Sequence, residues 1–143
     1  MTQEDKELLL KDLSARLPYR VKVIERSVII QTLYSLENAG KTWYVNPLHD
    51  EHGNIFPLST PIEECKPYLR SMESMTEEEE AELMKLGVCE YAFHNDIYDV
   101  GTYVDEAFTA LSWLFERHFD VNGLIEKGLA IEVTEEHNPY KED

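Results

Sequence analysis

YRVKVIERSVIIQTLYSLENAGKTWYV, residues 19–45, is the stretch that decides the fold. Its first part, 19–24, alternates valine with arginine and lysine, as a strand with one solvent-exposed face does. Residues 27–36 are rich in Val, Ile, Leu and Tyr and have no clear polar face, which predicts a central strand. The segment ENAG then predicts a hairpin loop, and 42–45 the returning strand. We therefore expect an antiparallel meander of three strands.

A first helix is predicted over residues 3–17, just before this meander. Thr2 can cap it, four leucines recur at helical spacing, and Pro18 ends it. We expect the leucine stripe to lie on the sheet and polar side chains, Asp12 among them, to point away from the stripe.

The segment 46–67 contains four prolines, which predicts a loop. A second helix is signalled after it, because Ser74 and Thr76 each have a glutamate three residues on. Residues 88–93 predict a fourth strand, and 129–133 an edge strand.

The clearest helical pattern covers residues 103–118 and predicts a core helix. Its apolar stripe steps by four, three, four and three: Val104, Phe108, Leu111, Phe115 and His118. Together these elements predict a single α+β domain over 1–143, with a meander of three to five strands and about three helices packed on it. Residues 134–143 are expected to form a flexible tail.

Composition narrows the function classes. The formal net charge is −16, and the acid excess lies after Arg26. The negative electrostatic field of this charge repels phosphate backbones and anionic lipid, so we expect no direct binding to nucleic acid or to membranes. The same field attracts basic protein surfaces. No apolar run approaches membrane-spanning length, and the N-terminal residues are acidic where a signal peptide is basic. These features favour the cytoplasm.

Catalytic signatures are missing from the chain. There is no GxGxxG, P-loop, HExxH or GxSxG motif, so the sequence favours a non-enzymatic protein and no cofactor is expected. Cys65 and Cys89 fit no zinc spacing; each could be paired with a histidine as a nucleophile, but a buried thiol is the commoner fate of cysteine.

His49 and His52 form the sharpest chemical cluster, with two carboxylates between them. Two imidazoles three residues apart can bind a divalent metal, but a third ligand would have to come from elsewhere, such as His94 or Asp96. The alternative is a solvated polar loop.

Two further groups could contact a partner. Trp113 lies away from the predicted apolar stripe and fits either an exposed binding anchor beside Arg117 or a half-covered ring with Arg117 stacked on it. A run of glutamates could imitate DNA phosphates, or be the solvated start of a helix. The run is Glu77, Glu78, Glu79 and Glu80.

Three segments of the chain are distinctive: LLKDLSARLPY (9–19), KPYLRSMESMTEEEE (66–80) and HFDVNGLIEKGLAIE (118–132). In these segments the chain resembles a family of small uncharacterised proteins encoded by phages, prophages and other mobile elements of gut Bacteroidales. The resemblance covers under a third of the chain, and Ser71 and Glu73 depart from it. It implies a bacterial or phage-infected cytoplasm and carries over no activity or site residue.

The leading hypothesis is an accessory protein of a phage or mobile element that binds another protein or a second copy of itself. One alternative is a DNA mimic that inhibits a defence nuclease through the glutamate run. Another, from a different class, is a small metal-assisted hydrolase that uses His49 and His52.

Overall fold

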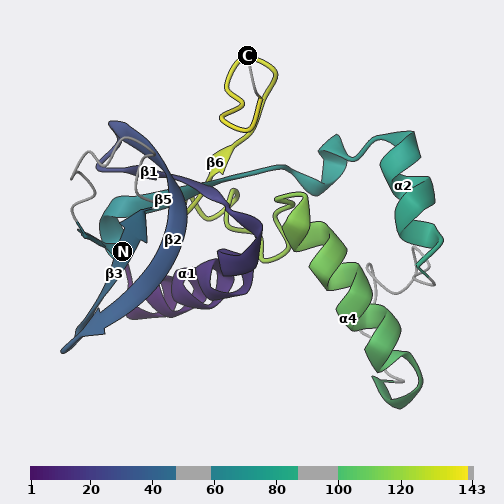
Figure 1. Ribbon diagram of the computed structural model, residues 1–143, viewed down its shortest axis with the longest axis horizontal. Coiled ribbons are helices and arrows are strands. Elements are labelled where there is room, and N and C mark those ends of the chain that lie inside the picture. The colour runs from purple at the N-terminus through teal and green to yellow at the C-terminus, as the bar shows by residue number, and fades with distance from the viewer. Residues whose placement is uncertain (48–58, 87–99, 142–143) are drawn as a thin grey trace.

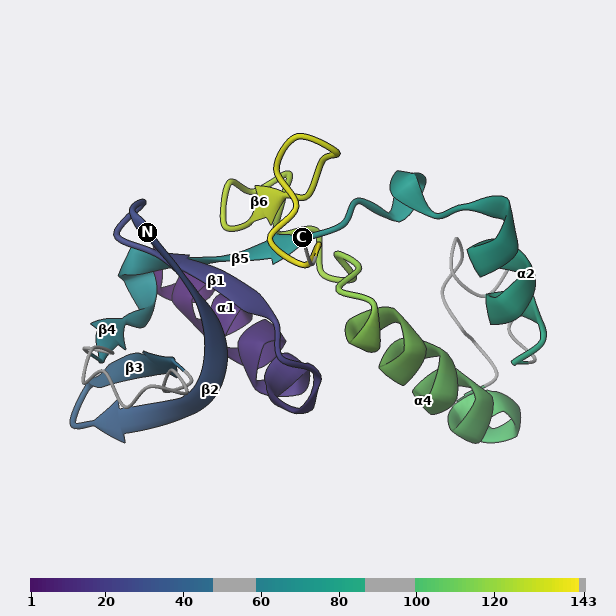
Figure 2. The same cartoon turned by 45° about the horizontal axis from the view of Figure 1, so that its top comes forward.

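A computed structural model describes residues 1–47, 59–86 and 100–141. Its helices are α1 Gln3–Arg16, α2 Glu77–Met84 and α4 Val100–Glu116. Its strands are β1 Lys22–Glu25, β2 Ile29–Ala39, β3 Thr42–Pro47, β4 Thr60–Pro61, β5 Cys65–Leu69 and β6 Ile131–Glu132. We call α1 with the six strands the sheet unit, and α2 with α4 the helical lobe; the chain leaving β5 leads from the first to the second (Figures 1 and 2).

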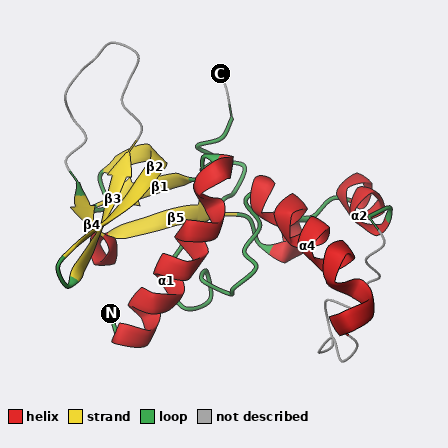
Figure 3. Cartoon of the chain, turned by 60° about the horizontal axis from the view of Figure 1, so that its bottom comes forward, coloured by secondary structure: helices red, strands yellow, loops and turns green. Residues whose placement is uncertain are grey.

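The strands form one sheet in the order β4-β3-β2-β1-β5-β6. All neighbours are antiparallel except β5 and β6, which are parallel. The α+β class is confirmed, with six strands where we expected three to five. Only α1 lies across a face of the sheet, whereas α2 and α4 stand beside it (Figure 3).

The meander is confirmed in order and pairing. The turn from β1 to β2 covers residues 26–28. Arg26 and Ser27 both have positive φ and the amide of Val28 donates to the carbonyl of Glu25 at 3.0 Å, as in a type I′ turn. In β2, Leu33 and Leu36 both pack in the core, because the register shifts between Leu33 and Ser35. This bulge moves the buried face by one residue, which explains why the sequence shows no simple alternation there.

Helix α1 begins as predicted, with a capping box between Thr2 and Asp5. The leucine stripe is also confirmed, since Leu9 and Leu13 are fully buried. The prediction for Asp12 was wrong: its side chain is completely buried. A salt bridge to Arg16, one turn further along the helix, makes that burial tolerable.

Strand β5 begins inside the segment 46–67, which we predicted to be a loop, and continues to Leu69. It pairs with β1 despite Pro67, which lies opposite Val23. Proline is tolerated there because β6 pairs only with Tyr68 and Leu69, so β5 has no second neighbour at Pro67 among the described residues. The short strand β6 confirms the predicted edge strand over 129–133.

In α4 the buried face differs from the predicted stripe. Phe108 is 72% exposed, whereas Trp113 is only 7% exposed and packs with Ala110 and Leu114. The reason is that α4 does not lie on the sheet; Leu83 of α2 covers its other side. Helix α2 itself starts at Glu77, and its N-cap Thr76 forms the predicted capping box with Glu79.

Tyr140, near the end of the described chain, is hydrogen-bonded to the sheet. Its hydroxyl donates to the carbonyl of Tyr68 at 2.7 Å and accepts from the amide of Lys22 at 2.9 Å. Tyr140 therefore contacts both β1 and β5, whereas residues 134–137 are exposed. The strand predicted over 88–93 lies outside the described residues.

Candidate functional site

A buried ion pair lies where the sheet unit meets the helical lobe. Arg16 Nε donates to Asp12 at 2.7 Å, and Arg16 Nη2 donates to the carbonyl of Phe119, also at 2.7 Å. Asn122 donates a further hydrogen bond to Asp12 at 2.8 Å. Arg16 thus connects the last turn of α1 to the chain that leaves α4, a hundred residues later. The i, i+4 spacing of Asp12 and Arg16 was the only sequence signal for it.

Four side chains form a layered stack beside the end of α4. The Arg70 guanidinium lies 4.2 Å from the centre of the Phe119 ring, and that of Arg117 lies 4.1 Å from the Trp113 ring. The two rings stack between them at 6.0 Å with an interplanar angle of 9°. We call Arg70, Phe119, Trp113 and Arg117 the cation–aromatic stack. Each contact of this type stabilises by about 0.5–2 kcal/mol.

Helix α2 holds both ends of the cation–aromatic stack. Glu79 accepts two hydrogen bonds from Arg70, at 2.7 and 2.8 Å. One turn on, Glu82 accepts one from Arg117 at 3.3 Å. The hydrogen bonds from Arg70 hold the pKa of Glu79 at about 2, below its usual 4.5. The first pair is bidentate and mostly shielded from solvent, so it is the stronger of the two.

The residues predicted to bind a partner can now be placed. Trp113 is buried, so the exposed-anchor interpretation is wrong, and the stacking of Arg117 on its ring is confirmed. Glu77, Glu78 and Glu80 are exposed, whereas Glu79 is occupied by Arg70 and by the helix cap. The glutamate run is thus not a uniform acidic surface.

Most of the residues predicted to bind metal or act as nucleophiles lie outside the described part of the chain. His49 and His52 lie outside the described residues, as does Cys89, and the described residues hold no group of three metal-ligating side chains. The buried-thiol interpretation is confirmed for Cys65, which is fully buried. Burial, together with Glu25 and Glu64, raises the pKa of this thiol to about 12, so it stays protonated and is a poor nucleophile.

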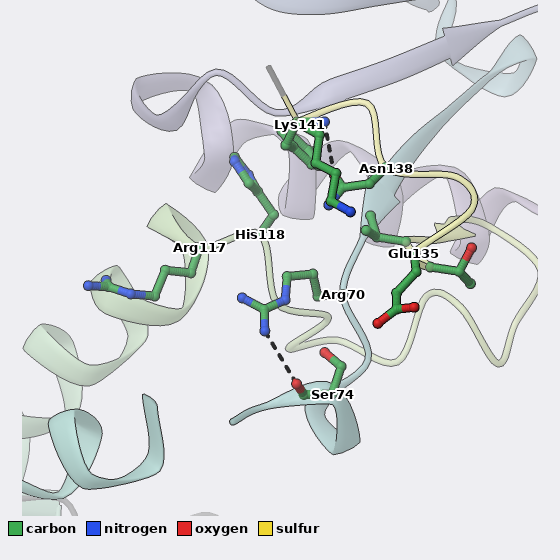
Figure 4. Close-up of a pocket in the computed structure, with 10 residues that line it drawn as sticks. Arg70, Ser74, Arg117, His118, Glu135, Asn138 and Lys141 are labelled. Carbon is green, nitrogen blue, oxygen red and sulfur yellow. Dashed lines mark hydrogen bonds between the residues drawn. The ribbon is translucent and has the colours of Figure 1, made fainter. Parts of the chain in front are cut away.

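A pocket of about 600 Å³ lies between the end of β5, the end of α4 and residues 133–141 (Figure 4). Its wall combines basic and polar side chains with one carboxylate: Arg70, Ser74, Arg117, His118, Thr134, Glu135, Asn138 and Lys141. No sequence pattern predicted this group, because its members lie on three separate segments of the chain. Only the tertiary fold brings them together.

His118 forms one side of this pocket. It has a positive φ of 65°, which turns the chain at the end of α4, and its ring stacks on Tyr140 at 3.9 Å. Burial, and then the nearby Arg16, Arg70 and Lys22, lower the pKa of His118 to about 4. The imidazole is therefore neutral at physiological pH, and its Nδ1 has no hydrogen-bond partner among the described residues.

A second surface lies on the face of the sheet opposite α1. Ile30 is 49% exposed and Tyr34 61% exposed, and both point away from the buried Leu33. Ile24 pairs with Ile30 across the strands and so shares this face. We call Ile24, Ile30 and Tyr34 the outer apolar patch. Val28 and Ile29 extend the exposed apolar surface at the hairpin turn.

Comparison with protein-family models, with curated proteins and with solved structures found no match. Among the described residues, none of the helices has the length and apolar character to span a bilayer.

Proposed function

We propose that the protein is a non-enzymatic accessory protein that acts by binding another protein, with the outer apolar patch as its contact surface. The observation that carries this proposal is the exposure of Ile30 and Tyr34 on one face of β2, on either side of Thr32, which accepts a hydrogen bond from Lys22. Large apolar side chains exposed together on one face mark interaction sites more often than scattered ones do. Aromatic residues such as Tyr34 are also enriched in protein interfaces.

Two further features support the proposal. Of the described helices, none covers this face of the sheet (Figure 3), and Ile30 and Tyr34 are exposed on it. The net charge of −16 would steer a partner with a basic surface toward the protein. The setting in a phage or mobile element is part of the proposal and rests on the three segments that resemble that family.

The test is a pull-down from nuclease-treated lysate of a bacterial host, comparing the natural chain with Ile30→Glu. A charge at the centre of an apolar contact should remove a bound partner. Met84→Glu is the matched control, since Met84 of α2 is exposed to a similar extent, 58%, and lies far from the patch. Circular dichroism on both variants checks that they fold.

Loss of one stoichiometric partner with Ile30→Glu alone would support the outer apolar patch. Equal capture by both variants would refute this surface, and capture of nothing by the natural chain would refute binding to a host protein. Size-exclusion chromatography with light scattering distinguishes a second copy of the chain from a different protein.

A further inference from the structure

The ring of Tyr140 lies between His118 and the sheet. Its hydroxyl donates to the carbonyl of Tyr68 and accepts from the amide of Lys22, so this one side chain is bonded to both β5 and β1. The imidazole of His118 stacks on the ring, with the two centroids 3.9 Å apart and an interplanar angle of 10°. The stack therefore joins the chain that leaves α4 to residues 138–141.

The surroundings of the His118 imidazole suit only its neutral form. Nδ1 is buried and has no hydrogen-bond partner among the described residues. In the neutral ring this nitrogen can be a bare lone pair, whereas in the protonated ring it carries a hydrogen that would have no acceptor. A buried donor without an acceptor costs free energy, so a proton on the ring opposes the position that the ring holds.

Hydrogen bonds also fix three cationic residues around His118. The Arg70 amide donates to the His118 carbonyl at 2.8 Å. Arg16 donates to the carbonyl of Phe119, the next residue, and the Lys22 amide donates to the ring on which the imidazole stacks. A fourth positive charge on the imidazole would lie among these cations.

Carboxylates offset part of this positive charge. Asp12 pairs with Arg16 and Glu79 with Arg70, but no carboxylate pairs with Lys22 among the described residues. Burial is accordingly the first cause of the low pKa of His118, about 4, and the three cations are the next. The other charged groups beside the imidazole are Glu135 and Lys141, which are exposed, and Arg117, which points in another direction in Figure 4.

We propose that His118 and Tyr140 form an acid-sensitive latch: the neutral imidazole holds residues 138–141 on β1 and β5, and its protonation releases them. The protonated ring leaves the stack to reach water, and Tyr140 then loses the surface that covers it. The latch shares no residue with the outer apolar patch, so the two proposals stand independently.

The direction of the pH dependence follows from the two protonation equilibria of His118. Its pKa is about 4 in the closed latch and near the usual 6.5 once the ring is in water. The imidazole therefore stabilises the closed form fully above pH 6.5, and this stabilisation is lost as the pH falls from 6.5 to 4. The open form binds one more proton in this interval, so opening should become about tenfold more favourable for each pH unit.

Hydrogen exchange of the Lys22 amide measures this opening, because that amide donates to the Tyr140 hydroxyl. Its protection, the exchange rate compared with that of an unstructured chain at the same pH, should fall about tenfold per pH unit between 6.5 and 4. The Leu33 amide donates to the Val21 carbonyl in the same sheet and should keep its protection, which makes it the internal reference. NMR titration of the His118 ring should give a midpoint of about 4.

Two variants separate the proton from the stack. His118→Phe keeps an aromatic ring that cannot be protonated, so the Lys22 protection should no longer depend on pH over this interval. Because the φ of 65° at this position suits phenylalanine less well, His118→Asn is the second variant. Asparagine tolerates that φ but has no ring, so the Lys22 protection should be low at every pH. His137→Phe, which removes an exposed imidazole of the same segment, is the matched control and should behave as the natural chain.

Three results would overturn the latch. The first is a Lys22 protection that stays constant between pH 6.5 and 4, or that falls equally in His118→Phe. The second is a His118 imidazole that titrates near 6.5, and the third is a parallel loss of protection at Leu33, which would mean that the whole sheet opens in acid. Glu79→Gln should leave the Lys22 curve unchanged above pH 4.5, which separates the latch from the ion pairs of α2.

Discussion

In the sheet unit, Leu9 and Leu13 of α1 pack against Val23 and Leu33 of the strands. In the helical lobe, by contrast, two aromatic rings lie between two arginines that α2 holds with glutamates. Apolar packing is insensitive to pH and is not weakened by salt, whereas exposed ion pairs are screened and carboxylates are neutralised by acid. The helical lobe should therefore open under conditions that leave the sheet unit folded.

The ion pair of Asp12 and Arg16 lies between these two regions. Both residues belong to α1, and Arg16 donates a hydrogen bond to the carbonyl of Phe119. The pair therefore links the sheet unit to the chain that leaves the helical lobe. Removing either partner leaves an uncompensated charge in a site that water does not reach.

Arg16→Leu should have the largest effect on stability. We expect the free energy of unfolding to fall by about 3–5 kcal/mol, because Asp12 is left buried without its counter-ion. Urea unfolding followed by circular dichroism measures this loss.

The double variant Asp12→Leu, Arg16→Leu separates the buried charge from the lost packing. It should recover most of the stability, since replacing both charges by apolar groups is often neutral. If the double variant is as unstable as Arg16→Leu, the hydrogen bond to Phe119 is the dominant contribution.

Trp113→Ala comes next, with an expected loss of about 3 kcal/mol confined to the helical lobe. Trp113 packs with Leu114 and Phe119 and not with the sheet, so hydrogen exchange should speed up in α4 and stay slow in β1 and β2. Phe108→Ala is the matched control, because Phe108 lies on the same helix but is largely exposed. Faster exchange across the sheet as well would show that the two regions unfold as one unit.

The contrast between the two regions also explains what could be predicted from the sequence. The sheet unit is built from local patterns: alternation in β1, the cap at Thr2 and the leucine stripe of α1 all predicted their elements correctly. Where prediction failed, a non-local contact overrode the pattern. Pro67 is accepted in β5 because β6 begins only opposite Tyr68, and α4 buries Trp113 because α2 covers that side.

The candidate sites could be predicted from the sequence less well than the fold. Arg70, His118 and Lys141 meet only in the folded chain, and none belongs to a motif. Ile30 and Tyr34 fall in a run whose apolar character predicted a buried strand. The three segments that resemble the mobile-element family contribute Arg16, Arg70 and Phe119, so they meet at the junction of the two regions.

Glu79→Gln should have the smallest of these three effects, about 1–2 kcal/mol, and it is the most direct test of the contrast. The folded-state pKa of Glu79, about 2, is below its usual 4.5, so its stabilisation is present above pH 4.5 and is lost as the pH falls toward 2. The protection of α2 and α4, which is their exchange rate compared with that of an unstructured chain at the same pH, should therefore fall in the natural chain over that interval. Glu79→Gln should remove this pH dependence while leaving the protection of β1 unchanged.

Glu82→Gln is its matched control on the same face of α2. The pair of Glu82 with Arg117 is longer, at 3.3 Å, and more exposed, so its loss should cost less than about 0.5 kcal/mol. If the two variants cost the same, the shielding of the Arg70 pair contributes nothing. The cation–aromatic stack would then owe its position to the apolar contacts of Leu83 and Phe119, and the helical lobe would differ from the sheet unit in shape but not in the kind of force that holds it.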